Sequence, residues 1–158
     1  MSKLTVVAEP GTHEVRMIRE FDAPRELVFK AFTDPQLIPR WWGAEAYETV
    51  VDKMEVHKGG MWRFIQSGDD EQYIFNGVFH QINAPESIVQ TFEFEGMPGH
   101  ILLETITFEE RDGKTIMTDS SVFQTVEDRE GMLQSGMEQG TDESMNRLEE
   151  LLKTLERA

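Results

Sequence analysis

The chain alternates hydrophobic and polar residues along most of its length and changes to a helical period near its C-terminal end. The alternating runs are separated by turns such as Lys58-Gly59-Gly60, Asn83-Ala84-Pro85 and Arg111-Asp112-Gly113, whose residues tolerate positive φ or fix a bend. Short turns of this kind join antiparallel neighbours. The pattern therefore predicts a seven-stranded antiparallel sheet, with strands over residues 13–21, 47–54, 60–67, 72–83, 86–95, 101–110 and 114–123.

Two short helices are predicted after the first strand. Residues 24–33 place Leu27, Val28, Ala31 and Phe32 on one side of a helix that begins at a proline. Asp34-Pro35 repeats this start signal and predicts a second short helix, which runs into Trp41-Trp42-Gly43.

The longest helical period runs from Gly131 to Arg157 and predicts one long helix. Its hydrophobic residues recur at steps of three and four and form one stripe: Leu133, Met137, Met145, Leu148, Leu151, Leu152 and Leu155. A single sheet followed by one long amphipathic helix predicts an α+β helix-grip fold, in which the sheet wraps around the helix. The sheet face beneath it is expected to carry Trp62, Phe64, Phe75, Phe79, Ile88 and Phe92.

Small residues interrupt the stripe in its first half, where Gly136, Gly140 and Ser144 follow at four-residue spacing. Two interpretations remain open: aromatic rings of the sheet fill this notch, or the notch is a cavity with aromatic walls. Methionines next to glycines suit a cavity wall, because a thioether adapts to irregular hydrophobic shapes, but they suit core packing as well. The candidate ligand-binding residues are Trp41, Trp42, Trp62, Phe64, Phe75, Phe79, Phe92, Met137, Gly140 and Met145.

Composition narrows the class of protein. A chain of 158 residues is the size of one domain, and we expect residues 1–158 to form one, with an ordered core over about 13–155. It has no cysteine, no secretion signal and no run of about 18 hydrophobic residues, so we expect a cytoplasmic protein that does not span a membrane. The net charge of −15 without a basic patch argues against nucleic-acid binding.

Few residues suggest chemistry. Glu104 alternates with Leu102, Ile106 and Phe108, which places a carboxyl group on a hydrophobic face, where it is a weak candidate for a general acid or base. His100 follows a loop that can border the mouth of a cavity and is the other weak candidate. The four histidines have no metal-binding spacing, so no metal is expected. No Gly-x-Ser-x-Gly motif is present, so a hydrolase triad has no support.

Several local motifs resemble the activator-of-heat-shock-protein-90-ATPase-like family. The residues that carry the likeness extend over most of the chain: Phe21-Asp22-Ala23-Pro24, Val28-Phe29, residues 31–35, Trp41-Trp42-Gly43, Gly59-Gly60, Gly77, Glu104-Thr105, Phe108, Gly113-Lys114-Thr115 and Phe123. This family belongs to the START-type, or SRPBCC, helix-grip superfamily, which includes polyketide cyclases and pollen-allergen-type ligand carriers. The co-chaperone that names the family has a further N-terminal domain, which we do not expect in this chain.

The resemblance implies a cavity between sheet and C-terminal helix that family members use for different purposes. We expect cofactor-free binding of a small hydrophobic or amphipathic molecule. Two alternatives stay open, a cyclase- or hydratase-type enzyme that uses the same cavity and a module that binds a chaperone or other protein through its acidic surface. Whether the chain is a monomer or a homodimer also stays open.

Overall fold

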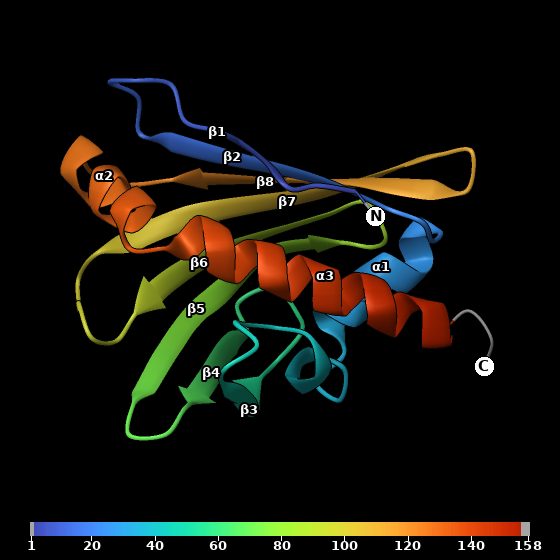
Figure 1. Cartoon of the computed structure of the whole chain (residues 1–158), viewed down its shortest axis with the longest axis horizontal. Coiled ribbons are helices and arrows are strands. Elements are labelled where there is room, and N and C mark those ends of the chain that lie inside the picture. Colours follow the sequence, from blue (N-terminus) through green and yellow to red (C-terminus); the bar gives the residue numbers. More distant parts are fainter. Residues whose placement is uncertain (1, 156–158) are drawn as a thin grey trace.

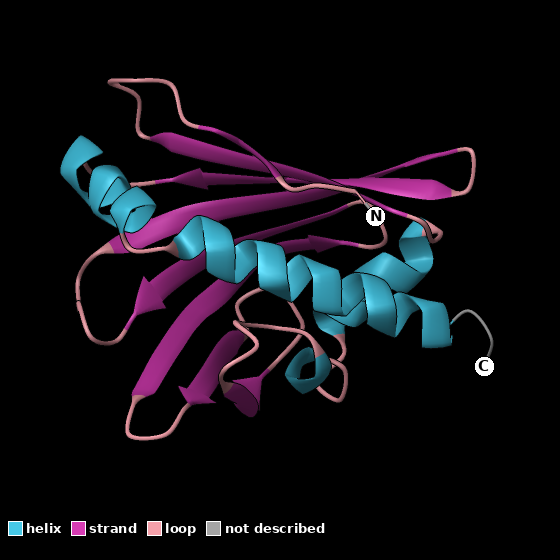
Figure 2. Cartoon of the chain, viewed as in Figure 1, coloured by secondary structure: helices cyan, strands magenta, loops and turns pink. Residues whose placement is uncertain are grey.

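The computed structural model describes residues 2–155 and contains one antiparallel sheet with helices on one of its faces (Figure 1, Figure 2). Neighbouring strands follow the order β1-β2-β8-β7-β6-β5-β4-β3. The strands are β1 (Thr5–Val7), β2 (Glu14–Phe21), β3 (Glu48–Met54), β4 (Met61–Ser67), β5 (Gln72–Asn83), β6 (Ser87–Phe94), β7 (Ile101–Arg111) and β8 (Lys114–Val122).

The alternation in the sequence specifies which side of each strand is buried. In β2, for example, Val15, Met17 and Phe21 are buried, while Arg16 and Glu20 point outward and are exposed. The turn between β7 and β8 has two residues, Asp112 and Gly113, both with positive φ (54° and 79°). Such turns match the twist of an antiparallel pair, which explains the tight hairpin.

The sheet has eight strands, so the prediction of seven was wrong by one. The additional strand is β1, which pairs with β2 at the edge of the sheet, from Thr5 opposite Ile18 to Val7 opposite Arg16. A strand of three residues is too short to show an alternating pattern, and its conformation depends on the edge that β2 offers.

The helical segment between β2 and β3 differs from the prediction in its second part. Helix α1 (Arg25–Thr33) agrees with the prediction, but the second helix is one 3₁₀ turn, η1 (Ile38–Arg40), that ends before Trp42. Trp41 is the C-terminal cap of η1, and Gly43 has a φ of 100°. The tryptophan pair therefore lies at the start of an irregular connection to β3.

The C-terminal segment is two helices, which corrects the prediction of one helix from Gly131 to Arg157; residues 156–158 lie outside the described residues. Helix α2 (Val126–Gln134) begins at Thr125, whose side chain accepts a hydrogen bond from Asp128 N at 3.0 Å. Helix α3 (Met137–Leu155) follows after a break at Gly136, whose φ of 87° is left-handed. Glycine commonly ends a helix in this conformation because it has no Cβ.

Helix α3 lies across the concave face of the sheet (Figure 1). Its second half packs into the main hydrophobic core through Met145, Leu148, Leu151 and Leu152. On the sheet, the predicted inner positions belong to the same core: Trp62, Phe64, Phe79 and Ile88 are buried, and Phe75 and Phe92 pack against them. The helix-grip arrangement is therefore present.

Candidate functional site

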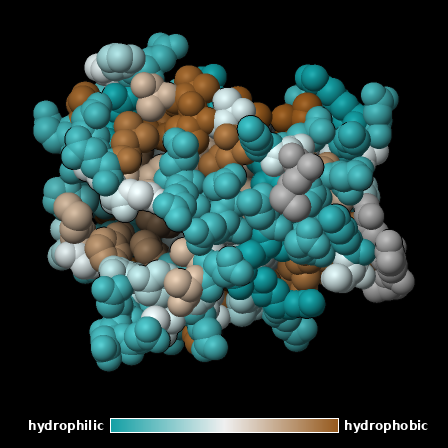
Figure 3. Space-filling model, viewed as in Figure 1, coloured by the Kyte–Doolittle hydropathy of each residue, from teal (hydrophilic) through white to brown (hydrophobic). Residues whose placement is uncertain are grey.

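Aromatic rings gather on the inner face of β4, β5 and β6. Trp42 lies against them with ring centroids 5.0 Å from Phe64 and 5.4 Å from Phe75, and Phe75 lies 5.4 Å from Phe92. Phe64 is buried, whereas Trp42, Phe75 and Phe92 are only half-buried. In Figure 3 hydrophobic residues lie recessed beside the first turns of α3, over β5 and β6. These half-buried rings present apolar surface that the core does not cover completely.

The loop that carries Trp42 is tied to α3 by hydrogen bonds. Ser144 Oγ donates to Trp41 O at 2.9 Å and accepts from Gly43 N at 3.1 Å. Arg147 Nη1 donates to Gly43 O at 3.2 Å, and Thr49 Oγ1 donates to Trp42 O at 2.6 Å. Ser144 is thus a small polar bridge to the loop, and its size lets the loop approach the helix.

The two glycines of the predicted notch have different roles. Gly136 lies at the break between α2 and α3, and a Cβ added there would meet nothing within 4 Å. Gly140 lies inside α3, and its added Cβ would meet only Ala44 Cβ, at 4.0 Å. Neither glycine is therefore required by a close contact. Met137, in the first turn of α3, is half-buried and packs against a second, smaller core with Val15 and Leu102.

The remaining predicted ligand-binding residues lie inside the core. Trp41 is 1% exposed, donates from Nε1 to Ala31 O at 3.0 Å and packs on Phe32. Phe79 and Met145 are buried in the same cluster. A direct role of these three residues in binding stays a prediction, and their present contacts are those of core residues.

A polar chain crosses the inner face of β6, β7 and β8. Gln90 Nε2 donates to Glu104 Oε1 at 2.7 Å, and Ser121 Oγ donates to Asp119 Oδ1 at 3.0 Å. The carboxyl groups of Glu104 and Asp119 lie close enough to interact, which joins the two halves.

Burial raises the pKa of Asp119 well above its usual range, and the negative charge of Glu104 and the hydrogen bond between the two groups raise it further. The bond from Ser121 acts in the opposite direction. Hydrophobic side chains flank Asp119, because Met17 and Ile106 lie opposite it on the two neighbouring strands. The inner face of the sheet therefore holds one carboxyl group, that of Asp119, that keeps its proton more readily than a solvated one.

Glu104 was predicted from the sequence, but its neighbour Asp119 was not. Asp119 alternates with Met117 and Ser121 on β8, so it lies on the same side of the strand as a buried methionine. That alternation could have predicted a buried carboxyl group at this position. The pairing across β7 and β8 places Glu104 opposite Ser121 and Ile106 opposite Asp119, which no local pattern reveals.

Two buried nitrogen-bearing side chains on the same face have unsatisfied donors. Trp62 is 2% exposed, and its Nε1 has no hydrogen-bond partner among residues 2–155. The indole lies over Gly77, where an added Cβ would come within 2.5 Å of Nε1. Arg19 is fully buried; it donates to Asn146 Oδ1 at 3.3 Å and lies 3.6 Å from Glu149 on α3, so it connects sheet and helix. Burial lowers the pKa of Arg19, and Glu149 and Asp142 oppose this.

His100 does not join the carboxyl pair. Its Nδ1 lies 2.9 Å from Asp128 Oδ1 on α2, and its side chain is 51% exposed. A catalytic role for His100 stays a prediction. Nowhere in residues 2–155 do three His, Asp or Glu side chains gather closely enough to hold a metal ion, and none of the described helices is long and apolar enough to cross a membrane.

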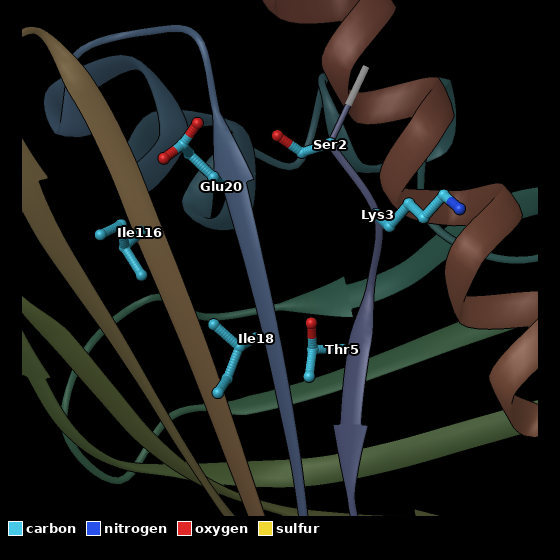
Figure 4. Close-up of a pocket in the computed structure, with 6 residues that line it drawn as sticks. All are labelled: Ser2, Lys3, Thr5, Ile18, Glu20 and Ile116. Atoms are coloured by element: carbon cyan, nitrogen blue, oxygen red, sulfur yellow. The ribbon is translucent and has the colours of Figure 1, made fainter.

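Two surface depressions lie away from the aromatic rings and the carboxyl pair. One, of about 350 Å³, lies at β1, β2 and β8 (Figure 4) and is lined by Ser2, Lys3, Thr5, Ile18, Glu20 and Ile116. The other, of about 420 Å³, lies beside α1 and is lined by Glu26, Phe29, Lys30, Thr33, Ala84 and Pro85. Neither contains a residue of the predicted site.

Comparison with known proteins agrees with this architecture. Residues 22–153 match the family model described as activator of Hsp90 ATPase homolog 1-like protein. A search of curated proteins gave no match.

Three solved structures illustrate the similarity. A Staphylococcus epidermidis protein solved by NMR is 26% identical, with a TM-score of 0.82 over 95% of this chain and 94% of that chain. A Rhodobacter sphaeroides protein has a TM-score of 0.88 at 22% identity, over 96% and 99% of the two chains. DynU16, from the dynemicin biosynthetic locus, has a TM-score of 0.69 at 20% identity, over 90% of this chain and 48% of that chain. At the identities of the last two, the likeness concerns the fold alone.

Proposed function

Since the chain belongs to the activator of Hsp90 ATPase homolog 1-like family, with its START-type helix-grip fold, we propose that it binds a small hydrophobic or amphipathic molecule between the sheet and α3, without a cofactor. The observation that supports this proposal is the incomplete burial of Trp42, Phe75 and Phe92, which lie next to the buried rings of the core. A ligand that covers such rings is stabilised by the removal of apolar surface from water.

The position of Trp42 offers a direct test. Of the three tryptophans it is the half-buried one, so bound ligand would change its fluorescence more than that of Trp41 or Trp62. The protein is titrated with a set of lipophilic compounds, and affinity is measured by calorimetry for the wild type and for Trp42→Ala. We expect binding in the wild type and at least about tenfold weaker binding in the variant, because loss of a contact worth about 1.4 kcal/mol changes affinity tenfold.

A matched control is Val50→Ala, which shortens a side chain that is 55% exposed on β3 and should leave affinity unchanged. A wild-type protein that binds none of the compounds would contradict the proposal. Equal loss of affinity in both variants would show that Trp42→Ala acts through general destabilisation rather than through a lost contact.

The carboxyl pair favours a second candidate function, an enzyme of the cyclase or hydratase type in which Glu104 transfers a proton. Next to Glu104, the raised pKa of Asp119 favours a protonated carboxyl, and a carboxyl group can donate a proton at one step and accept one at another. Binding and catalysis are separated by Glu104→Gln, which would abolish turnover of a bound substrate while changing its affinity much less. A product that forms at the same rate with the variant would exclude this role.

A protein partner is the remaining prediction, consistent with the family and with the net charge of −15. Binding to such a partner is tested by measuring whether the protein stimulates a chaperone's ATPase activity at low and at high salt. Charge-dominated association weakens as salt increases, and no stimulation at low salt would remove the prediction.

A further inference from the structure

The carboxyl group of Glu104 lies beside the half-buried aromatic rings on the inner face of the sheet. Glu104 is opposite Gln90 in the pairing of β6 with β7, and Phe92 lies two residues further along β6 on the same side. Diagonal neighbours of this kind are about 7–8 Å apart, within reach of long side chains. The ring centroid of Phe92 lies 5.4 Å from that of Phe75, which lies 5.4 Å from that of Trp42. One small molecule can therefore contact Glu104 and the three rings together.

The same residues border a space that solvent reaches. On the inner face Glu104, Gln90 and Phe92 are half-buried, whereas Ile106, the next inner residue of β7, is buried. All buried side-chain oxygens of residues 2–155 have a hydrogen-bond partner, but Glu104 accepts its bond from Gln90 at Oε1 and has no partner of the described residues at Oε2. Oε2 is therefore accessible to solvent. In Figure 3 hydrophobic residues lie recessed over β5 and β6, next to this position.

The negative charge of Glu104 is not offset by a neighbouring cation. None of the ion pairs formed by residues 2–155 includes Glu104. Arg19, which is buried on the same face, is directed to Asn146 and Glu149 instead. The carboxyl group of Asp119, close to Glu104, brings no positive charge either. In a chain with a net charge of −15, this position attracts cations and repels anions.

The rings beside Glu104 also suit a cation. A cation is attracted to the face of an aromatic ring within about 6 Å of the ring centroid, and more strongly where water is excluded. The planes of Trp42 and Phe75 are inclined by 69° and those of Phe75 and Phe92 by 40°, so the rings form a curved wall rather than a flat stack. Ring surface and a carboxylate without a positively charged partner thus lie together in one recess.

We propose that the ligand is a cationic amphiphile, an organic ammonium ion whose head group pairs with Glu104 and whose apolar body covers Trp42, Phe75 and Phe92. This inference rests on the proposed function, because it assigns the polar end of the molecule that those rings bind. It adds the chemical class of the ligand, which the rings alone do not define. A carboxylate or phosphate head is disfavoured, since it would bring a second negative charge next to Glu104.

The test compares four compounds that share one ring system and differ in head group: naphthylmethylamine, naphthylmethanol, methylnaphthalene and naphthoate. Their affinities for the full chain are measured by calorimetry at neutral pH, where the amine is a cation and naphthoate an anion. We expect the amine to bind at least about tenfold more tightly than the alcohol, because a hydrogen bond between two charged groups contributes this factor. Naphthoate should bind most weakly. Added salt should weaken binding of the amine but not of methylnaphthalene.

The matched variants are Glu104→Gln and Glu109→Gln, which make the same change on the same strand and raise the net charge equally; Glu109 is surface-exposed. We expect Glu104→Gln to bind the amine at least about tenfold more weakly than the wild type and methylnaphthalene equally well. Glu109→Gln should behave as the wild type. If thermal unfolding shows that Glu104→Gln does not fold, Phe92→Leu replaces it. That variant keeps an apolar side chain without a ring, so it should lose more affinity for the amine than for methylnaphthalene.

The outcomes separate the two proposals. If methylnaphthalene binds but the amine binds no more tightly than the alcohol, the cationic ligand is wrong while the ligand-binding function stands. If Glu104→Gln weakens binding of the amine no more than Glu109→Gln does, the amine is held by the acidic surface in general and the inference is overturned. Tightest binding of naphthoate, or equal losses for both ligands in Phe92→Leu, would overturn it as well. If none of the four compounds binds, both proposals fail together.

Discussion

Replacement of Gly140 by alanine tests whether the space beside the first turns of α3 is as open as the structure shows. Alanine favours a helix interior over glycine by about 1 kcal/mol, mainly because glycine loses more backbone freedom on folding. The added methyl group would meet only Ala44 Cβ, at 4.0 Å, which is an ordinary van der Waals contact. Gly140→Ala should therefore stabilise the protein by about 0.5–1 kcal/mol.

For a chain of this size such a gain raises the melting temperature by about 1–4 °C. The measurement is thermal unfolding followed by circular dichroism, with two control variants. Gly131→Ala, in α2, also meets nothing within 4 Å and should give a similar gain. Gly136→Ala should instead destabilise by about 1–2 kcal/mol, because its φ of 87° disfavours any residue with a Cβ.

A lower melting temperature for Gly140→Ala together with a higher one for Gly131→Ala would refute the open space beside Gly140. That result would mean that a side chain or bound molecule lies closer to Gly140 than Ala44 does. Loss of stability in all three variants would point to an error in the helix boundaries instead, because Gly131 and Gly140 would then not lie in helix interiors.

The next three predictions each concern one residue: Gly77, Ser144 and Asp119. Gly77→Ala should lower the free energy of unfolding, measured in urea, by about 1–3 kcal/mol, because the new Cβ would lie 1.9 Å from the backbone oxygen of Thr91. A variant as stable as the wild type would contradict this packing. Ser144→Ala should cost about 1–2 kcal/mol in the same assay through its lost bonds to Trp41 and Gly43, and no loss would mean that the loop is held by other contacts. The raised pKa of Asp119 means that the folded state holds its proton longer than the unfolded state, so this group makes stability fall as pH rises above about 4. Asp119→Asn should make that decline less steep, by at most about 1.4 kcal/mol per pH unit. The free energy of unfolding in urea is measured against pH for both proteins, and parallel curves would refute the raised pKa of Asp119.

Much of the sheet could be predicted from the sequence, since hydrophobic alternation and turn residues are local signals. The prediction of β7 and β8 was accurate for this reason: Asp112 and Gly113 specify the tight turn, and Ile106, Phe108 and Met117 specify the buried side. The break at Gly136 was missed because the spacing of hydrophobic residues continues across it, and a left-handed glycine leaves no mark in that spacing.

The candidate site was predictable only in part. The alternation in β7 identified Glu104 as a carboxyl group on a hydrophobic face, and the structure places it on the inner side, half-buried and bonded to Gln90. Trp41 and Trp42 are adjacent in the sequence, yet one is buried in the core and the other is half-buried beside Phe75. Nothing local distinguishes the two indoles, because their exposure depends on which segments pack over them.

The sequence by itself determined strands β2 to β8, the inner face of the sheet and the hydrophobic stripe of the last helix, because all three follow from periodicity within one segment. Tertiary structure alone decided that the carboxyl groups of Glu104 and Asp119 lie next to each other, that the Trp62 N–H has no hydrogen-bond partner among residues 2–155 and that Ser144 holds the loop of Trp42. These features depend on strand register and on contacts between residues far apart in the chain, and register is a property of paired strands rather than of either one.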